Sequence, residues 1–220
     1  MTKPLLRQDT WHCEHGISGL THPSCYYRFV KQIENGRVGY IDIEMTQLKA
    51  DFGIMLSWAI KTKGKSEIFC DVIKKEDFRR KLDTHHYIFD YRITKSLIEK
   101  MQHYEWLISY YGTAFDLPTI RTRALFWKLP YPGYGQIKHK DLYYVARNKL
   151  NLHSNRLAVV SSFLGFKEKT PLEPWIWQNA MAGDEKALQY IKTHNIKDVV
   201  VLEKVHNILE PFTSVTRRSI

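Results

Sequence analysis

Residues 39 to 44 read Gly39-Tyr40-Ile41-Asp42-Ile43-Glu44, a stretch with the alternation of a β-strand. Successive side chains of a strand point to opposite faces, so Asp42 and Glu44 share one face with Tyr40, and the two isoleucines share the other. Two carboxylates on one face of a core strand repel each other and resist desolvation. A hard divalent cation such as Mg²⁺ would relieve both, because it prefers oxygen ligands. The alternative is the exposed face of an edge strand, and this pair alone leaves both open.

The segments around this strand predict an antiparallel opening of the sheet. Asn35-Gly36 separates the apolar run 26–33 from the run 38–44, and Asn-Gly between two such runs is typical of a hairpin. Residues 53–62 and 67–73 have the composition of two further strands. We therefore expect the first three strands from residue 38 onward to pair antiparallel.

From Glu76 onward the pattern alternates between helix and strand. We expect helices at 76–82 and 93–103, a strand at 106–110, a helix at 117–126, a helix after Asp141, and helical structure over 175–209 with a break near Gly183. Antiparallel strands followed by strand–helix alternation predict an α/β domain with a mixed sheet, flanked by helices and ending in a helical C-terminal part.

Two further acidic sites lie far along the chain. Asp116 precedes Pro118 at an expected helix start, where its ordinary role would be that of an N-cap. His194 and Asp198 are four residues apart on an expected helix, so they share one face. An exposed His–Asp pair of this spacing is common, and neither site is informative by itself.

The joint order of these sites resembles the DEDD-type 3′–5′ exonucleases of the ribonuclease-H-like superfamily. The resemblance runs from about residue 38 to 209 and rests on three motifs and one connecting segment. These are Asp42-Ile43-Glu44-Met45-Thr46, Tyr110-Tyr111-Gly112-Thr113-Ala114-Phe115-Asp116-Leu117-Pro118, His194-Asn195-Ile196-Lys197-Asp198 and His139-Lys140-Asp141-Leu142. The chain departs from the family at Tyr111, where Asn is usual, and at His194, where Tyr is usual.

The resemblance implies a ribonuclease-H-like fold and phosphodiester hydrolysis with two Mg²⁺ or Mn²⁺ ions. The resemblance implies that four carboxylates bind the ions and that His194 activates the attacking water. It implies substrate contacts at Thr46, Leu48, Tyr111 and Asp141. The metal-ligand set is Asp42, Glu44, Asp116 and Asp198. For Phe115 we favour core packing over base stacking.

The same resemblance implies a single-stranded 3′ end of DNA or RNA as the partner. The formal net charge of +10, from 33 Lys and Arg against 23 Asp and Glu, favours a polyanionic partner too, although such a charge can serve solubility alone. Two alternatives share the fold: a non-catalytic nucleic-acid-binding module and a structure-specific endonuclease.

A separate motif lies near the N-terminus, where Cys13, His15, His22 and Cys25 fall within thirteen residues. Two thiols and two imidazoles are the ligand types of a structural Zn²⁺ site. The alternatives are a loop with free thiols or a Cys13–Cys25 disulfide, which a reducing compartment disfavours. His12 is a possible substitute ligand.

Length and hydropathy limit the possible domain organisation and membrane association of the chain. The chain has 220 residues, and no apolar run reaches the ~20 residues needed to cross a bilayer. The N-terminus also lacks the apolar stretch of a signal peptide. We therefore expect a cytoplasmic protein without membrane association. We divide it into an N-terminal Cys/His segment (1–25), a ribonuclease-H-like domain (26–210) and a C-terminal tail (211–220).

Overall fold

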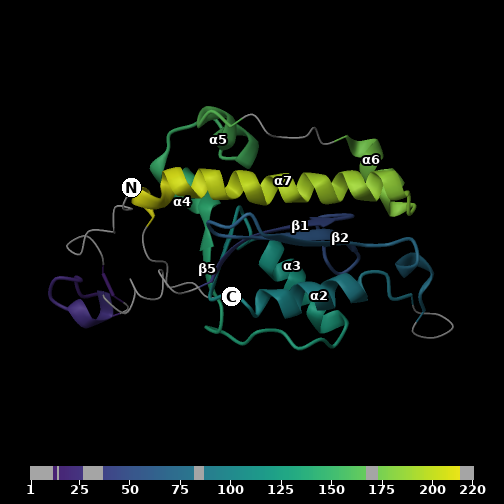
Figure 1. The fold of residues 1–220 in the computed structure, drawn as a ribbon, viewed down its shortest axis with the longest axis horizontal. Helices are drawn as coiled ribbons and strands as arrows, with labels where there is room; N and C mark the ends of the chain where they lie inside the picture. Colours follow the sequence, from purple (N-terminus) through teal and green to yellow (C-terminus); the bar gives the residue numbers. More distant parts are fainter. Residues whose placement is uncertain (1–11, 14, 27–36, 82–86, 167–172, 214–220) are drawn as a thin grey trace.

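A five-stranded mixed sheet forms the centre of the protein (Figure 1). The computed structural model describes residues 12–13, 15–26, 37–81, 87–166 and 173–213. The strand order is β3-β2-β1-β4-β5, with β1–β2 and β2–β3 antiparallel and β1–β4 and β4–β5 parallel. The strands are β1 (Val38–Met45), β2 (Met55–Thr62), β3 (Ile68–Val72), β4 (Trp106–Ser109) and β5 (Lys138–Asp141).

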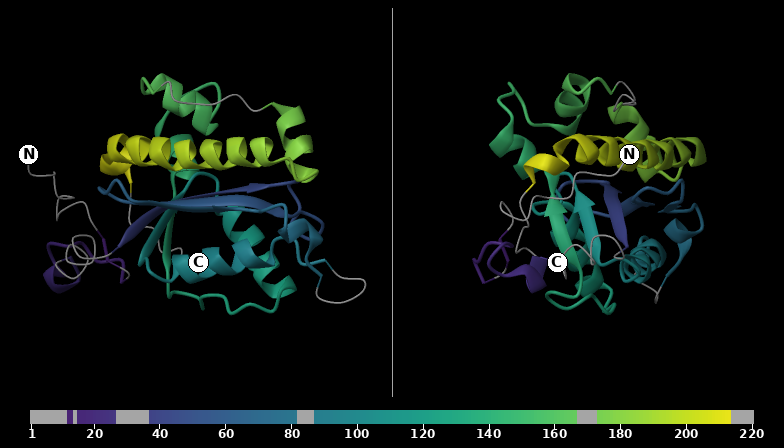
Figure 2. Two further views of the ribbon diagram at one scale, coloured as in Figure 1. Left: turned by 45° about the vertical axis from the view of Figure 1, so that its right-hand side comes forward. Right: turned by 60° about the vertical axis from the view of Figure 1, so that its left-hand side comes forward.

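Helices cover both faces of this sheet, as Figure 2 shows from two directions. One face carries α2 (Tyr91–Met101) and α3 (Asp116–Phe126), and the other carries the long helix α7 (Glu185–Leu209). On the outer side of α7 lie α5 (Leu157–Phe163) and α6 (Pro174–Met181), while α4 (Leu142–Lys149) follows β5 directly. Two short 3₁₀ turns, Asp77–Arg79 and Glu210–Phe212, are also present. No helix among the described residues is long and apolar enough to span a membrane.

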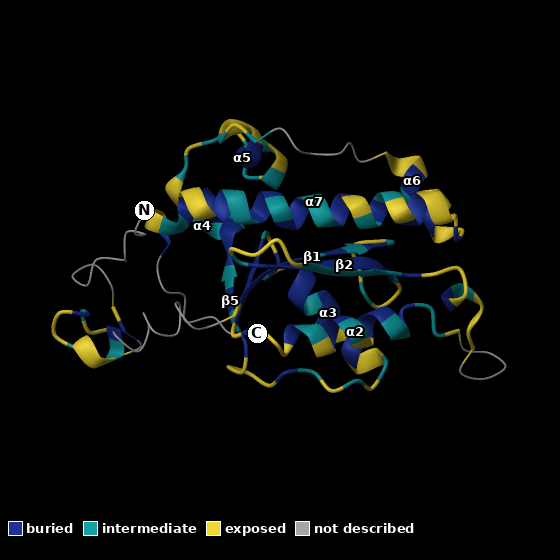
Figure 3. Ribbon diagram, viewed as in Figure 1, coloured by how far each residue is buried: buried dark blue, intermediate teal, exposed yellow. Residues whose placement is uncertain are grey.

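Strand β1 explains the layering, because its two faces differ in chemistry. Ile41 and Ile43 are buried in the core shared with α2 and α3, whereas Tyr40 is buried in a second core with residues of α7. The buried stripe of α7 faces the sheet in Figure 3. At about 1.5 Å per residue, a helix as long as α7 crosses the whole sheet. The carboxylates of β1 therefore lie on the face that α7 covers.

A buried ion pair joins the layer of α2 and α3 to the sheet. Arg123 of α3 donates two hydrogen bonds to Asp90, at the N-terminal end of α2, over 2.8 and 2.6 Å. The same carboxylate accepts the Met55 N–H of β2 at 2.9 Å and the Trp127 indole N–H at 2.8 Å. Both charges are almost completely buried, so these bonds replace the water that the two groups have lost.

The expected fold class is confirmed: a mixed sheet with antiparallel first strands, flanked by helices, with a helical C-terminal part. Most expected elements lie within two residues of the observed ones, including the break at Gly183, which has a φ of +82°. The helix expected at 76–82 is wrong; a 3₁₀ turn stands there, and position 82 lies outside the described residues. Strand β5 and helix α5 were not expected. The hairpin expected at Asn35-Gly36 also lies outside the described residues.

Candidate active site

Strand β1 extends beyond the end of its parallel neighbour β4, and the candidate site lies along the part of β1 that β4 does not pair with. Strand β4 pairs with β1 only as far as Tyr40, so the later backbone of β1 is open on that side. Asp116, the first residue of α3, occupies the gap: its Oδ1 accepts the Ile43 N–H at 3.2 Å. The bond links Asp116 to the strand residue between Asp42 and Glu44. The N-cap role open to Asp116 is not the one it adopts, because its carboxylate accepts a bond from the sheet.

The loop between β4 and α3 is shaped to place Asp116 there. Tyr111 has a positive φ of 68°, and Gly112 lies so close to Ser109 that a Cβ would come within 2.1 Å of the Ser109 hydroxyl. That same Cβ would be 3.1 Å from Asp116 Oδ2. Asp141 holds the loop from the other side, accepting the Tyr111 N–H at 2.8 Å and the Thr113 N–H at 2.9 Å. Only glycine allows this approach at position 112.

Helix α7 supplies the remaining groups. His194 Nε2 lies 3.7 Å from Glu44 Oε1 and 3.7 Å from Asp198 Oδ2, so this imidazole stands between two carboxylates. Asn195, fully buried, donates from Nδ2 to Asp42 Oδ2 over 2.6 Å. The structure thus brings together residues 42, 44, 116, 194 and 198, from three elements, where the sequence places them up to 156 positions apart.

The pKa values of Asp42 and Asp116 are both raised. The pKa of Asp42 lies well above its usual value, first because the group is buried and then because Glu44, Asp116 and Asp198 repel its charge. Burial raises the pKa of Asp116 to about 7, even though backbone hydrogen bonds, including that from Ile43, oppose the shift. A cluster of this kind is costly to ionise unless positive charge is supplied.

The donor set fits divalent cations of the Mg²⁺ type. Asp42, Glu44, Asp116 and Asp198 provide hard oxygen ligands, the type that Mg²⁺ prefers. The amide oxygen of Asn195 is also buried without a hydrogen-bond partner among the described residues. Bound cations would offset the mutual repulsion of these negative charges.

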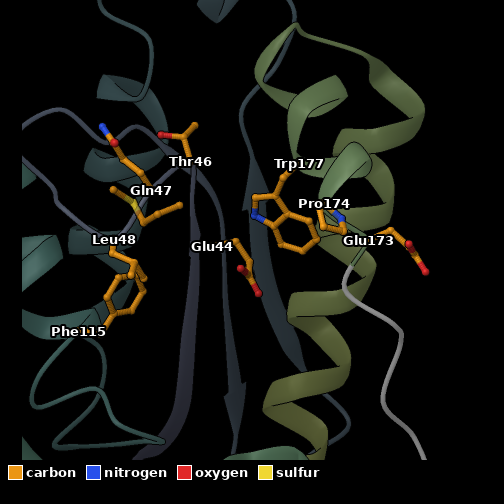
Figure 4. Close-up of a pocket in the computed structure, with 9 residues that line it drawn as sticks. Glu44, Thr46, Gln47, Leu48, Phe115, Glu173, Pro174 and Trp177 are labelled. Carbon is orange, nitrogen blue, oxygen red and sulfur yellow. The ribbon is translucent and has the colours of Figure 1, made fainter.

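A cleft opens beside the carboxylates (Figure 4). Its walls differ: Phe115 and Leu48 stand on one side, Trp177 and Pro174 of α6 on the other, and the Glu44 carboxylate points between them. Its volume of about 400 Å³ is within the range of small-ligand pockets. Trp177 also meets the ring of His194 edge-on, with 6.0 Å between ring centroids. The cleft therefore combines apolar and aromatic side chains with the Glu44 carboxylate and with polar side chains at Thr46, Gln47 and Glu173.

Residues 39–210 match the family model of the ribonuclease H (RNase_H) superfamily. The chain belongs to this superfamily. Among solved structures, the family B DNA polymerase from the hyperthermophilic archaeon Pyrobaculum calidifontis is similar, with a TM-score of 0.59 and 14% sequence identity. The match covers 78% of this chain but only 24% of the polymerase chain, so it is a likeness of fold. No curated protein matches the chain. Membership of the RNase_H superfamily favours nuclease chemistry and divalent cations.

The positions expected to contact substrate differ in their surroundings. Leu48 is 80% exposed at the cleft, and Tyr111 is exposed with its ring against Tyr143. Thr46 also lines the cleft, but its hydroxyl accepts the Ile54 N–H at 2.9 Å. Asp141 is buried and bonded to backbone amides of the Gly112 loop and of α4. In this RNase_H chain it positions that loop.

Four residues contribute to the site in ways that were not expected from the sequence. Asn195 lies inside a quoted motif, but its contact with Asp42 spans 153 residues and has no local signal. Trp177 and Pro174 belong to α6, which the sequence indicates only as helix. Phe115, expected in the core, packs against the core and also lines the cleft.

The Cys/His segment is also compact. Cys13, His15, His22 and Cys25 each offer one ligand atom, and these four atoms all lie within 4.8 Å of one another. All three cysteines of the chain are free thiols, so the alternative Cys13–Cys25 disulfide is absent. The cluster therefore has the donor atoms to hold a metal ion.

Proposed function

We propose that the chain is a DEDD-type 3′–5′ exonuclease that hydrolyses phosphodiester bonds of DNA or RNA with two Mg²⁺ or Mn²⁺ ions. The observation that carries this proposal is the convergence of four carboxylates from β1, α3 and α7, in which Glu44, Asp116 and Asp198 lie around Asp42. A binding module would have no reason to concentrate negative charge where a polyanion must approach. Cations at this point reverse the sign of the local field.

Each residue has a role in this proposal. Asp42, Glu44, Asp116 and Asp198 would hold the cations, which supply charge stabilisation and an activated water when bound. His194, between Glu44 and Asp198, would accept or orient the proton of the attacking water. Asn195 keeps the Asp42 carboxylate in one orientation through its 2.6 Å hydrogen bond.

The cleft favours an unpaired chain end as the substrate. Phe115 and Trp177 present aromatic surfaces on opposite walls, and the Glu44 carboxylate of β1 points between them. Stacking of a base on an aromatic ring contributes about 1–3 kcal/mol, and only an unpaired base can enter between two walls. A terminal nucleotide in the cleft would place its phosphodiester beside Glu44. The net charge of +10 supports attraction of the rest of the strand.

Single-stranded oligonucleotides labelled at the 5′ or the 3′ end test this proposal. With Mg²⁺ or Mn²⁺, we expect a ladder of 5′-labelled products that shorten one nucleotide at a time, and immediate release of the 3′ label as a mononucleotide. Internal cuts that appear first would indicate the endonuclease instead. Retained binding without cleavage would indicate the binding module. DNA and RNA of one sequence, compared side by side, would show the preferred sugar.

Asp42→Asn is the decisive variant, and Glu99→Gln is its matched control. Glu99 is an exposed carboxylate of α2 whose ion pair with Lys95 spans one helical turn. We expect Asp42→Asn to lose at least a thousandfold in rate, because the charge of a proposed metal ligand is removed, while Glu99→Gln cleaves like the parent. Full Mg²⁺-dependent cleavage by purified Asp42→Asn protein would refute the assignment.

A further inference from the structure

The Cys/His segment, residues 12–26, contains a second set of metal-ligand side chains that the nuclease proposal does not use. Cys13 Sγ lies 3.5 Å from His15 Nδ1 and 3.3 Å from His22 Nδ1. Cys25 Sγ lies 3.9 Å from His15 Nδ1 and 3.9 Å from His22 Nε2. Each thiol is therefore close to both imidazoles, and the four side chains face one point.

These separations match the edges of a zinc tetrahedron. Zinc binds sulfur at about 2.3 Å and nitrogen at about 2.0–2.1 Å, so tetrahedral angles separate S and N ligands by about 3.5–3.6 Å. The distances from His15 Nδ1, 3.5 Å to Cys13 Sγ and 3.9 Å to Cys25 Sγ, and the 3.3 Å from His22 Nδ1 to Cys13 Sγ lie near this value. With one ligand atom from each of the four residues, all four atoms lie within 4.8 Å of one another. The rings of His15 and His22 are tilted by 54° with centroids 5.1 Å apart, so they are not stacked on each other. An ion at the centre needs only small side-chain movements.

The local backbone prepares this arrangement. Cys13 and Gly16 close a tight turn, in which the Gly16 N–H donates to the Cys13 carbonyl at 2.8 Å and Gly16 has a φ of +76°. The Cys13 N–H in turn donates to Ile17. His22 and Cys25 are three residues apart on one helical turn, where the Cys25 N–H donates to the His22 carbonyl at 3.2 Å. Residues three apart on a helix share a face, so both ligands of this half point the same way.

The segment also lacks a core of its own. Within residues 12–26, the buried hydrophobic side chains among those described are Cys13 and Tyr26. A segment this short buries too little apolar surface to offset the conformational entropy of ordering it. Small modules of this size are usually held by a disulfide or a metal, and both thiols here are free.

We propose that Cys13, His15, His22 and Cys25 bind one structural Zn²⁺ ion, and that this ion holds residues 12–26 in their fold. Two sulfur and two nitrogen ligands in a tetrahedral arrangement select zinc over Mg²⁺ and Mn²⁺, which prefer oxygen. The four-ligand set is complete, so this ion has no open position for substrate and takes no part in hydrolysis.

Metal analysis of the full chain, purified without added zinc, tests the proposal. We expect one zinc per chain, and no zinc in the double variant Cys13→Ser, Cys25→Ser. Cys70→Ser removes the remaining cysteine, which lies in β3, and His12→Ala removes the exposed histidine next to the cluster. Both control variants should keep the full zinc content. Zinc-free parent protein that also fails to take up added zinc would overturn the site, as would full zinc content in the double variant.

Cobalt substitution supplies a readout of the ligand set itself. Co²⁺ in place of zinc should give the visible absorption of a tetrahedral ion and the ultraviolet bands of thiolate ligands. Replacement of His15 by Ala should change the visible spectrum, since one nitrogen ligand is lost, whereas His12→Ala should not. An octahedral spectrum without thiolate bands would contradict the proposed ligands.

The zinc proposal and the nuclease proposal can be refuted independently of each other. Asp42→Asn should keep one zinc per chain although it loses cleavage, because the two ligand sets share no residue. A chain that holds zinc but cleaves nothing would leave this proposal intact and end the nuclease proposal. A chain that cleaves 3′ ends with Mg²⁺ but binds no zinc would do the reverse.

Discussion

At the scale of single residues, Asp42 is the carboxylate most affected by desolvation and by repulsion from its acidic neighbours. Its carboxylate is half-buried beside three other acids and accepts a hydrogen bond from Asn195. The sequence predicts the pairing of Asp42 with Glu44, because both follow from strand alternation. The bond to Asn195 could not be predicted, because it depends on how α7 is rotated over β1. That rotation is set by packing of the whole helix.

Asp42→Asn should stabilise the protein in buffer free of divalent cations. The pKa of Asp42 is raised in the folded state, so the folded protein loses stability as the pH rises above the unfolded value of about 3.9. Asparagine carries no charge and can still accept the Asn195 hydrogen bond. Urea unfolding should therefore show a gain for the variant that is small near pH 4 and larger at pH 7. A variant less stable than the parent at pH 7 would contradict this electrostatic account.

Gly112→Ala should disable the site through its backbone. The added methyl would lie 2.5 Å from Ser109 Cβ and closer still to the Ser109 hydroxyl, so the loop before Asp116 must move. Overpacking of this kind costs about 1–3 kcal/mol, and displaced Asp116 should lower the cleavage rate more than the stability loss explains. Gly133→Ala is the control, since its Cβ would meet nothing nearer than 3.6 Å. Parent-like rates in folded Gly112→Ala protein would show that the close approach is unimportant.

At the scale of elements, the sequence predicts helices and strands that have a regular pattern of apolar residues. It does not predict elements that are polar or short. The strands β1 and β4 and the helices α2 and α7 have apolar patterns that their burial confirms, whereas β3 is only half-buried. Strand β5 reads Lys138-His139-Lys140-Asp141, four polar residues with no strand propensity, and it is a strand because β4 pairs with it in parallel. Helix α5 is seven residues long and too short for a clear period. Both depend on tertiary partners.

The ion pair between Asp90 and Arg123 should be the strongest polar link between the α2–α3 layer and the sheet. Asp90→Ala leaves the Arg123 charge buried without its carboxylate, and such a loss costs about 3–5 kcal/mol. Urea unfolding of Asp90→Ala measures this cost. Arg123→Met added to Asp90→Ala should restore part of the stability, because no buried charge is left. Glu99→Gln, which removes an exposed pair in the same helix, should change stability by less than about 1 kcal/mol.

At the scale of the whole molecule, the site exists because α7 crosses the sheet above the end of β1. The sheet fixes Asp42 and Glu44, the parallel β4 ends early enough to admit Asp116, and α7 brings Asp198 from the far end of the chain. Two helical layers hold these three elements in place, so the like charges cannot move apart. The free energy of packing therefore maintains a charge cluster that would disperse in a flexible chain.

Divalent cations should consequently stabilise the entire fold. A ligand that binds only the folded state adds about 2.7 kcal/mol when its concentration is a hundred times its Kd. For a chain of this length that corresponds to a rise in Tm of roughly 5–10 °C. Thermal scans with increasing Mg²⁺ should show this rise in the parent protein, and a much smaller one in Asp42→Asn, whose cluster is already relieved. The variant Cys13→Ser, Cys25→Ser should keep the full Mg²⁺ effect, because its substitutions lie outside the carboxylate cluster. An equal rise in Asp42→Asn and parent would mean that Mg²⁺ binds elsewhere on the protein.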